Sequence, residues 1–172
     1  MATPFRLWEN AQIVNLLPAA ADAAGRISSY VSVKYGHKAF LVCGVNQGNA
    51  ATVTFTPLQA TDNLGTNSAG LSAGAPIAAD LDTSTSTGSD QFTFPAAAAS
   101  YTTDAGLKNK IVVFEIDPVE QMNPNNLASG NPLPFSHIAI QTGASNAANI
   151  TSAYLVVMPL RDQRLNPPTT YV

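Results

Sequence analysis

Two histidines and one cysteine are the residues of this chain best suited to metal binding or nucleophilic catalysis. His37 lies between two strand-like segments, and His137 lies inside another. A metal site needs three or four converging ligands, but no His-x-x-x-His or Cys-x-x-Cys spacing is present. Cys43 belongs to an alternating apolar run, where a thiol is inert unless a positive environment lowers its pKa. We therefore predict no catalytic, cofactor-binding or metal-binding residue, and a buried structural role for Cys43.

Three aspartates offer a second kind of site. Asp80, Asp82 and Asp90 could supply the oxygen ligands that Ca²⁺ prefers. The further acidic positions and the placed glycine of an EF-hand loop are absent. The alternative is an ordinary polar loop, and we favour it.

A pair of carboxylates is the third candidate. Glu115 and Asp117 are two residues apart on one expected strand, so their side chains would share a face. Glycoside hydrolysis uses two carboxylates, but at a separation that spacing along one strand does not define. We expect one of the two to face solvent or to pair with Lys108 or Lys110.

Sequence motifs of other reactions are missing as well. Neither GxxxxGK[ST] nor GxGxxG occurs, so no phosphate-binding loop is indicated, and there is no GxSxG nucleophile elbow. The sequence therefore predicts a structural or binding protein and not an enzyme.

The elements that would position these residues are β-strands. In the segment 52–56, Val53 and Phe55 alternate with Thr52, Thr54 and Thr56, which is typical of a half-buried strand. The turn-forming residues 47–50 separate this segment from the apolar run 38–46. We expect the two runs to form a β-hairpin.

Further strands are expected along the chain, at 11–17 (ended by Pro18), 27–35, 76–82, 109–117 (in mid-sheet), 135–141 and 150–160. About eight strands at irregular spacing, without a convincing helix, favour an all-β antiparallel β-sandwich of jelly-roll or Greek-key type. We expect one domain over residues 11–161, an N-terminal arm over 1–10 and a C-terminal tail over 162–172.

Extended arms with apolar anchors suit docking onto a partner. The residues that we expect to contact a partner are Phe5, Leu7, Trp8, Pro167, Pro168 and Tyr171. The alternative is that they pack on their own domain, or that the tail is disordered.

The amino-acid composition favours a protein whose surface is in contact with other proteins. Charged residues make up 11% of the 172 residues, against about a quarter in a typical globular protein. The net charge of −3 and the lack of a Lys/Arg cluster argue against nucleic-acid binding. No segment is long and apolar enough to cross a membrane, and the start is not typical of a signal peptide. We therefore expect synthesis in a cytoplasm, and a surface made to lie against protein; a secreted β-protein is the alternative.

Four segments together resemble a family of small head proteins of tailed bacteriophages, the head decoration or cement proteins. They are Glu9–Val14, Val45–Val53 continuing through Pro57–Asp62, Leu107–Pro118 and Thr142–Tyr154. The resemblance covers most of residues 9–160, and is weakest at 118–134 and after 161. These segments encode strands and turns, so they indicate kinship more firmly than function.

The resemblance implies a jelly-roll-like protein without catalytic activity, bound to the outer surface of an icosahedral capsid. It would clamp neighbouring subunits of the major capsid protein, and it would associate with copies of itself as a dimer or trimer. The alternative is a carbohydrate- or receptor-binding module of the virion, in a tail or head fibre. In that case Tyr30, Tyr101 and Tyr154 could line a sugar-binding groove.

Overall fold

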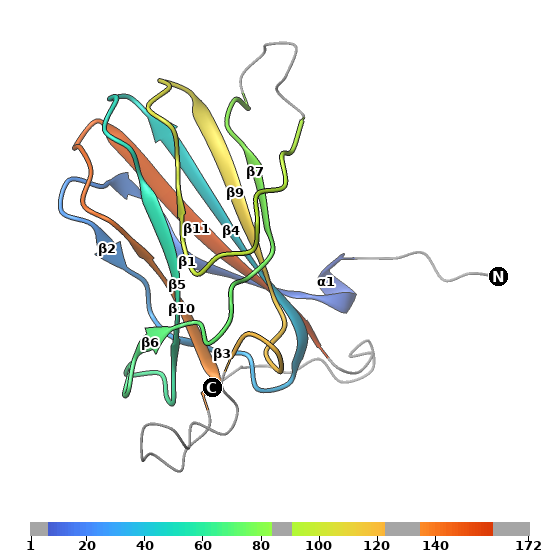
Figure 1. Cartoon of the computed structure of the whole chain (residues 1–172). Coiled ribbons are helices and arrows are strands. Elements are labelled where there is room, and N and C mark those ends of the chain that lie inside the picture. Colours follow the sequence, from blue (N-terminus) through green and yellow to red (C-terminus); the bar gives the residue numbers. More distant parts are fainter. Residues whose placement is uncertain (1–6, 84–90, 123–134, 160–172) are drawn as a thin grey trace.

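Two antiparallel sheets pack face to face in the computed structural model, which describes residues 7–83, 91–122 and 135–159 (Figure 1). The predicted all-β sandwich is confirmed, whereas the jelly-roll subtype stays a prediction. The helix α1 (Leu7–Asn10) is four residues long and lies beside the start of β1. Within the described ranges, no helix has the length and hydropathy needed to span a membrane.

One layer is a five-stranded sheet. Its order is β1 (Gln12–Ala21), β11 (Asn149–Pro159), β4 (Gly36–Gln47), β9 (Asn109–Ile116) and β7 (Ile77–Asp80). The strand predicted at 109–117 is confirmed, and it lies inside the sheet because β9 pairs with both β4 and β7. The strands expected at 76–82 and 150–160 are confirmed as well.

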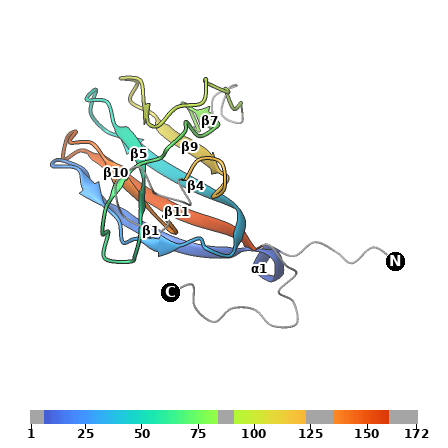
Figure 2. The same ribbon diagram turned by 60° about the horizontal axis from the view of Figure 1, so that its bottom comes forward.

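The other layer is a six-stranded sheet. Its main order is β2 (Arg26–Ile27), β10 (His137–Thr142), β5 (Thr54–Ala60) and β6 (Ala69–Gly70). In addition, β3 (Val31–Ser32) pairs with β10, and β8 (Tyr101–Thr102) pairs with β5. The strand predicted at 135–141 corresponds to β10. Figure 2 shows the same two layers from a second direction.

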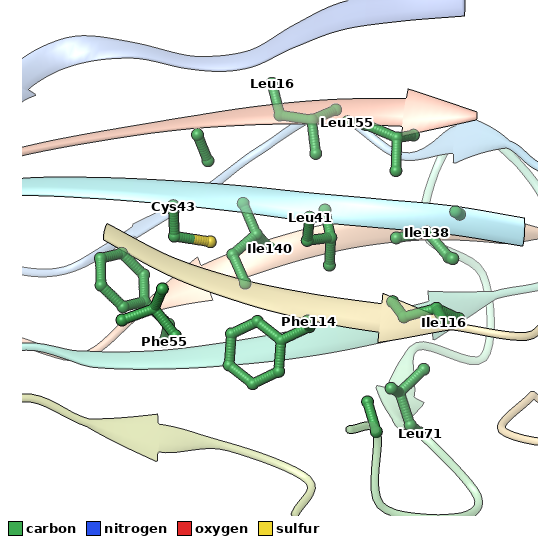
Figure 3. Close-up of a cluster of buried hydrophobic side chains, with 14 of the residues drawn as sticks. Leu16, Leu41, Cys43, Phe55, Leu71, Phe114, Ile116, Ile138, Ile140 and Leu155 are labelled. Atoms are coloured by element: carbon green, nitrogen blue, oxygen red, sulfur yellow. The ribbon is translucent and has the colours of Figure 1, made fainter. Parts of the chain in front are cut away.

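Alternating side chains from both sheets fill the space between them (Figure 3). The five-stranded sheet contributes Leu41, Phe114 and Leu155, and the six-stranded sheet contributes Phe55, Ile138 and Ile140, all of which are completely buried. Burial of such side chains stabilises the fold by about 1.5–3 kcal/mol each.

The predicted hairpin over residues 38–60 is wrong. The two strands exist, but β4 pairs with β11 and β9, whereas β5 pairs with β10, β6 and β8. Both edges of β4 are therefore occupied, and the linker after Gln47 crosses to the other sheet. Asn149 holds this linker, since its side chain accepts from the Asn49 amide and donates to the Ala51 carbonyl.

Two other predicted strand limits are also corrected. β1 does not end at Pro18 but runs on to Ala21, with irregular register between Leu17 and Ala20. Proline is compatible with this position because β1 is an edge strand, where one side of the backbone forms no ladder. The predicted strand 27–35 is divided into β2 and β3, because the Ser28 side chain accepts the Ile140 amide proton between them.

Candidate functional site

The residues predicted to carry chemistry do not converge. His37 is exposed, and His137 is half-buried with its Nδ1 3.0 Å from the Ser136 hydroxyl. Partial burial lowers the pKa of His137, which favours its neutral form. Among the described residues, no three His, Cys, Asp or Glu side chains gather as metal ligands would.

Cys43 lies in the core, as predicted. It points inward from β4 beside Leu41 and is completely buried (Figure 3). Burial raises the pKa of the thiol far above its ordinary value, so it stays protonated. A thiol in this position has the structural role that the sequence indicated.

The acidic candidates are held by lysines or by backbone amides. Asp80 is buried and accepts a hydrogen bond from the Asp82 amide. The Asp82 carboxylate forms an ion pair with Lys108, and Asp90 lies outside the described residues. Asp80 is the last residue of β7 and not part of a loop, whereas Asp82 lies just after the strand.

Glu115 does not pair with Lys108 or Lys110, contrary to one of the two expectations. It forms an ion pair with Lys38 of the neighbouring strand β4, and this hydrogen bond raises the pKa of Lys38. Asp117 follows the end of β9 and accepts from the Val119 amide in a turn. The two carboxylates therefore have different partners and separate roles.

A buried polar cluster at one end of the sandwich was not predicted. Lys110 points inward from β9, and its Nζ lies 2.6 Å from Asp104 Oδ1 and 2.8 Å from Gln47 Oε1. Gln47 also accepts from the Thr103 hydroxyl, which in turn accepts from the Val53 amide. These bonds connect β4, β9 and the loop before β9 with the start of β5.

A second cluster at the same end links the two sheets. The buried Asp22 accepts a 2.7 Å hydrogen bond from the Thr142 hydroxyl. Arg26 donates to the Thr151 hydroxyl at 2.6 Å and lies 4.0 Å from Asp22. These contacts join the end of β1 and β2 to β10 and β11. Asp22 Oδ2 and Arg26 Nε are buried without a hydrogen-bond partner among the described residues.

The three tyrosines proposed for a sugar groove lie on different parts of the molecule. Tyr30 contacts the loop that contains Gly65 and bonds to the Ser68 hydroxyl. Tyr101 packs against the core from β8. Tyr154 projects outward from β11 in the other sheet. They do not form one groove.

The predicted partner-contact residues are only partly described. Leu7 lies in α1 and is 43% exposed. The backbone of Trp8 belongs to the same helix. Phe5, Pro167, Pro168 and Tyr171 lie outside the described residues, so their contacts stay predictions.

One surface suited to binding is the outer face of the five-stranded sheet. Its residues alternate with the buried core residues, and paired residues on neighbouring strands point the same way. One row across the sheet runs from Tyr154 through Val42 and Val113 to Ala78. We define the outer apolar face by its half-buried or exposed side chains Ile13, Phe40, Val42, Ile111, Val113, Ile150, Tyr154 and Val156.

This face has a projection and a hollow on opposite sides of β4. Tyr154 on β11 is 44% exposed. On the other side of β4, a cavity of about 180 Å³ is lined by Phe40, Pro76, Ile77, Ala78, Phe94, Val113 and Glu115. Phe94 at its border is 80% exposed.

The outer face of the six-stranded sheet is different in character. Thr54, Thr56, Thr102 and Gln141 project from it, and the Thr54 and Thr102 hydroxyls are 2.8 Å apart. This face is rich in hydroxyls but also carries the exposed Ile27. On the outer face of the five-stranded sheet, apolar side chains predominate in the centre, and around them lie Asn15, Asn46, Ser152, Lys38 and Glu115. Contiguous exposed apolar patches of this kind mark sites of interaction with another protein or a membrane.

Comparison with known proteins adds little. No family model and no curated protein matches the chain. Among solved structures it is similar to the SPBc2 prophage-derived protein YomS, with 9% sequence identity and a TM-score of 0.47, over 86% of this chain and 93% of that chain. At this identity and TM-score, the likeness does not extend to the function of the chain.

Proposed function

We propose that the chain is a virion structural protein of a tailed bacteriophage, which decorates and stabilises the outer surface of an icosahedral capsid. It would bind neighbouring major-capsid subunits through its arms, associate with copies of itself, and make or break no covalent bond. The resemblance of four segments to head decoration proteins motivates this proposal.

The outer apolar face is the structural observation that supports this proposal most strongly. A sandwich with 11% charged residues and one largely apolar outer face is suited to permanent contact with protein. Buried apolar area contributes about 25 cal/mol per Å², less the cost of ordering the arms. Repeated binding over a lattice would add avidity.

Mixing the purified protein with undecorated capsids tests the proposal. We expect saturable occupancy and a higher temperature of capsid disruption. Substituting the arm anchors (Phe5→Ala with Trp8→Ala) should lower occupancy, whereas Thr56→Asp on the hydroxyl-rich face is the matched control and should not. Absence of binding and of stabilisation by the unmodified protein would refute the role.

The carbohydrate- or receptor-binding alternative requires a surface that gathers aromatic side chains. Tyr30, Tyr101 and Tyr154 lie apart, so no observation favours it at present. Specific binding to defined sugars on a glycan array would reverse this preference.

A further inference from the structure

We propose that the outer apolar face pairs with the same face of a second copy, in a two-fold symmetric dimer whose axis runs along β4. This inference deepens the proposed function and rests on its self-association, but it does not depend on capsid binding.

The size of the face is the first argument. Five strands about 4.8 Å apart and a length of about 26 Å, that of the eight residues of β9, give about 600 Å² in projection on each copy. Two copies would then bury about 1,200 Å², which is at the lower end of the range for stable protein interfaces. The face alone is therefore large enough for a specific dimer.

Its charge is the second argument. The register places three acidic or basic side chains of the described strands on the outer face: Lys38, Glu115 and Asp80. Lys38 and Glu115 form an ion pair, and Asp80 at the end of β7 is only 3% exposed. The face therefore exposes little unpaired charge that would repel an identical face. A second copy fits it as well as any unrelated protein does.

The positions of the projection and of the hollow are the third argument, because they determine where the two-fold axis lies. In a two-fold interface, residue i of one copy contacts residue j of the other, and j contacts i. The projecting Tyr154 and the hollow beside Val113 lie one strand to either side of Val42. A two-fold axis along β4 places each Tyr154 over Val113 of the other copy, so both hollows are filled at once.

Such a dimer would also suit the proposed clamp. Facing sheets lie about 10 Å apart, so two copies would form one rigid body. Each copy would bring its own arms, and the pair could then reach two neighbouring capsid subunits.

Sedimentation velocity of the free protein tests the surface. We expect a dimer for the unmodified chain, at least a tenfold weaker dimer for Val42→Asp at the axis, and an unchanged dimer for Thr56→Asp on the opposite face. A monomeric unmodified chain, or a Val42→Asp dimer of undiminished strength, would overturn the proposal. Failure of capsid binding would leave this result untouched, because no capsid is present.

Mixing two variants tests whether Tyr154 contacts Val113 of the other copy. Recovery of a dimer on mixing would also show that each variant is folded. Tyr154→Lys and Val113→Asp should each dimerise at least tenfold more weakly alone. Mixed, they should form a heterodimer, because one contact becomes a Lys–Asp pair and the other keeps the original Tyr–Val contact. If the mixture stays as monomeric as its components, the assigned pairing is wrong.

Discussion

Lys110 and Asp104 form an ion pair whose two ends lie in different environments. The Lys110 side chain is completely buried, whereas that of Asp104 is 55% exposed. The ammonium also donates to the Asp104 carbonyl and to Gln47 Oε1. The buried charge thus fixes the loop around Asp104 to the ends of β4 and β9.

Removing Asp104 and removing Lys110 should lower the stability of the fold by different amounts. Asp104→Ala leaves a buried ammonium without its counter-charge and should lower the free energy of unfolding by about 1–2 kcal/mol, because the lost carboxylate is itself half exposed and solvent-screened. Lys110→Met removes the same pair but leaves an apolar side chain in the interior, so the loss should be below about 1 kcal/mol. Urea unfolding followed by circular dichroism measures both. A larger loss for Lys110→Met would show that the buried charge itself is stabilising.

The same pair should make stability depend on acid. The hydrogen bond from Lys110 to the Asp104 carboxylate lowers the pKa of Asp104 below the ordinary value of about 3.9. The folded protein then binds fewer protons than the unfolded chain, so this contribution is present above that value and is lost as pH falls through the lowered pKa. Urea midpoints between neutral and acidic pH should therefore fall less steeply for Lys110→Met than for the unmodified protein.

Asp62 adds an acid dependence that the unmodified protein and Lys110→Met share. Hydrogen bonds from Thr66 lower the pKa of Asp62 in the same direction, so part of the acid dependence should survive in Lys110→Met. Identical pH profiles for the two proteins would mean that Asp104 makes no contribution.

Cys43 should report on global unfolding. Its thiol is completely buried and its pKa is raised by burial, so it should not react with an aromatic disulfide reagent in the native state. Labelling should begin only in the urea range where circular dichroism reports unfolding. Rapid labelling of the native protein would contradict this expectation and show that the core around β4 opens without global unfolding.

Two glycines provide a matched pair of substitutions. Gly65 has a φ of 79°, and a Cβ there would lie 2.6 Å from the Tyr30 ring. Gly65→Ala should destabilise the fold by about 1–2 kcal/mol, because a left-handed conformation is strained with a side chain. Gly70 has no atom within 4 Å of such a Cβ, so Gly70→Ala should change thermal stability little. Equal effects of the two substitutions would contradict the loop geometry.

The strands could be predicted from the sequence more readily than their partners. Alternation correctly indicated that Val53 and Phe55 face the core, and both are completely buried. The same pattern arises whether two successive strands share a sheet or face each other across a core. The linker between β4 and β5 crosses to the other sheet and is held there by Asn149. Asn149 lies about a hundred residues from this linker in the sequence, so the local pattern could not reveal the contact.

We expected Glu115 or Asp117 to face solvent or to pair with Lys108 or Lys110, and the sequence itself shows why Glu115 does not pair with Lys110. Residues an odd number apart on one strand point to opposite faces, so Lys110 could not share the outer face with Glu115. Lys110 instead points inward, where composition alone does not predict a charged residue. Its partners Gln47 and Asp104 come from other elements, so periodicity within one strand could not identify the cluster.

The outer apolar face was only indirectly predictable. Low charge over the whole chain suggested a surface made for contact with protein, but it could not locate that surface. The location depends on which strands lie side by side, since Tyr154, Val42 and Val113 are brought into one row by pairing between distant segments.

The number of copies in purified virions tests the proposed role most directly. Quantitative mass spectrometry of the particles that contain this chain would compare it with the major capsid protein. A decoration protein should be present in a fixed ratio to the capsid lattice, with hundreds of copies on each particle. A handful of copies, as expected for a tail or portal component, would contradict the proposed role on the capsid surface.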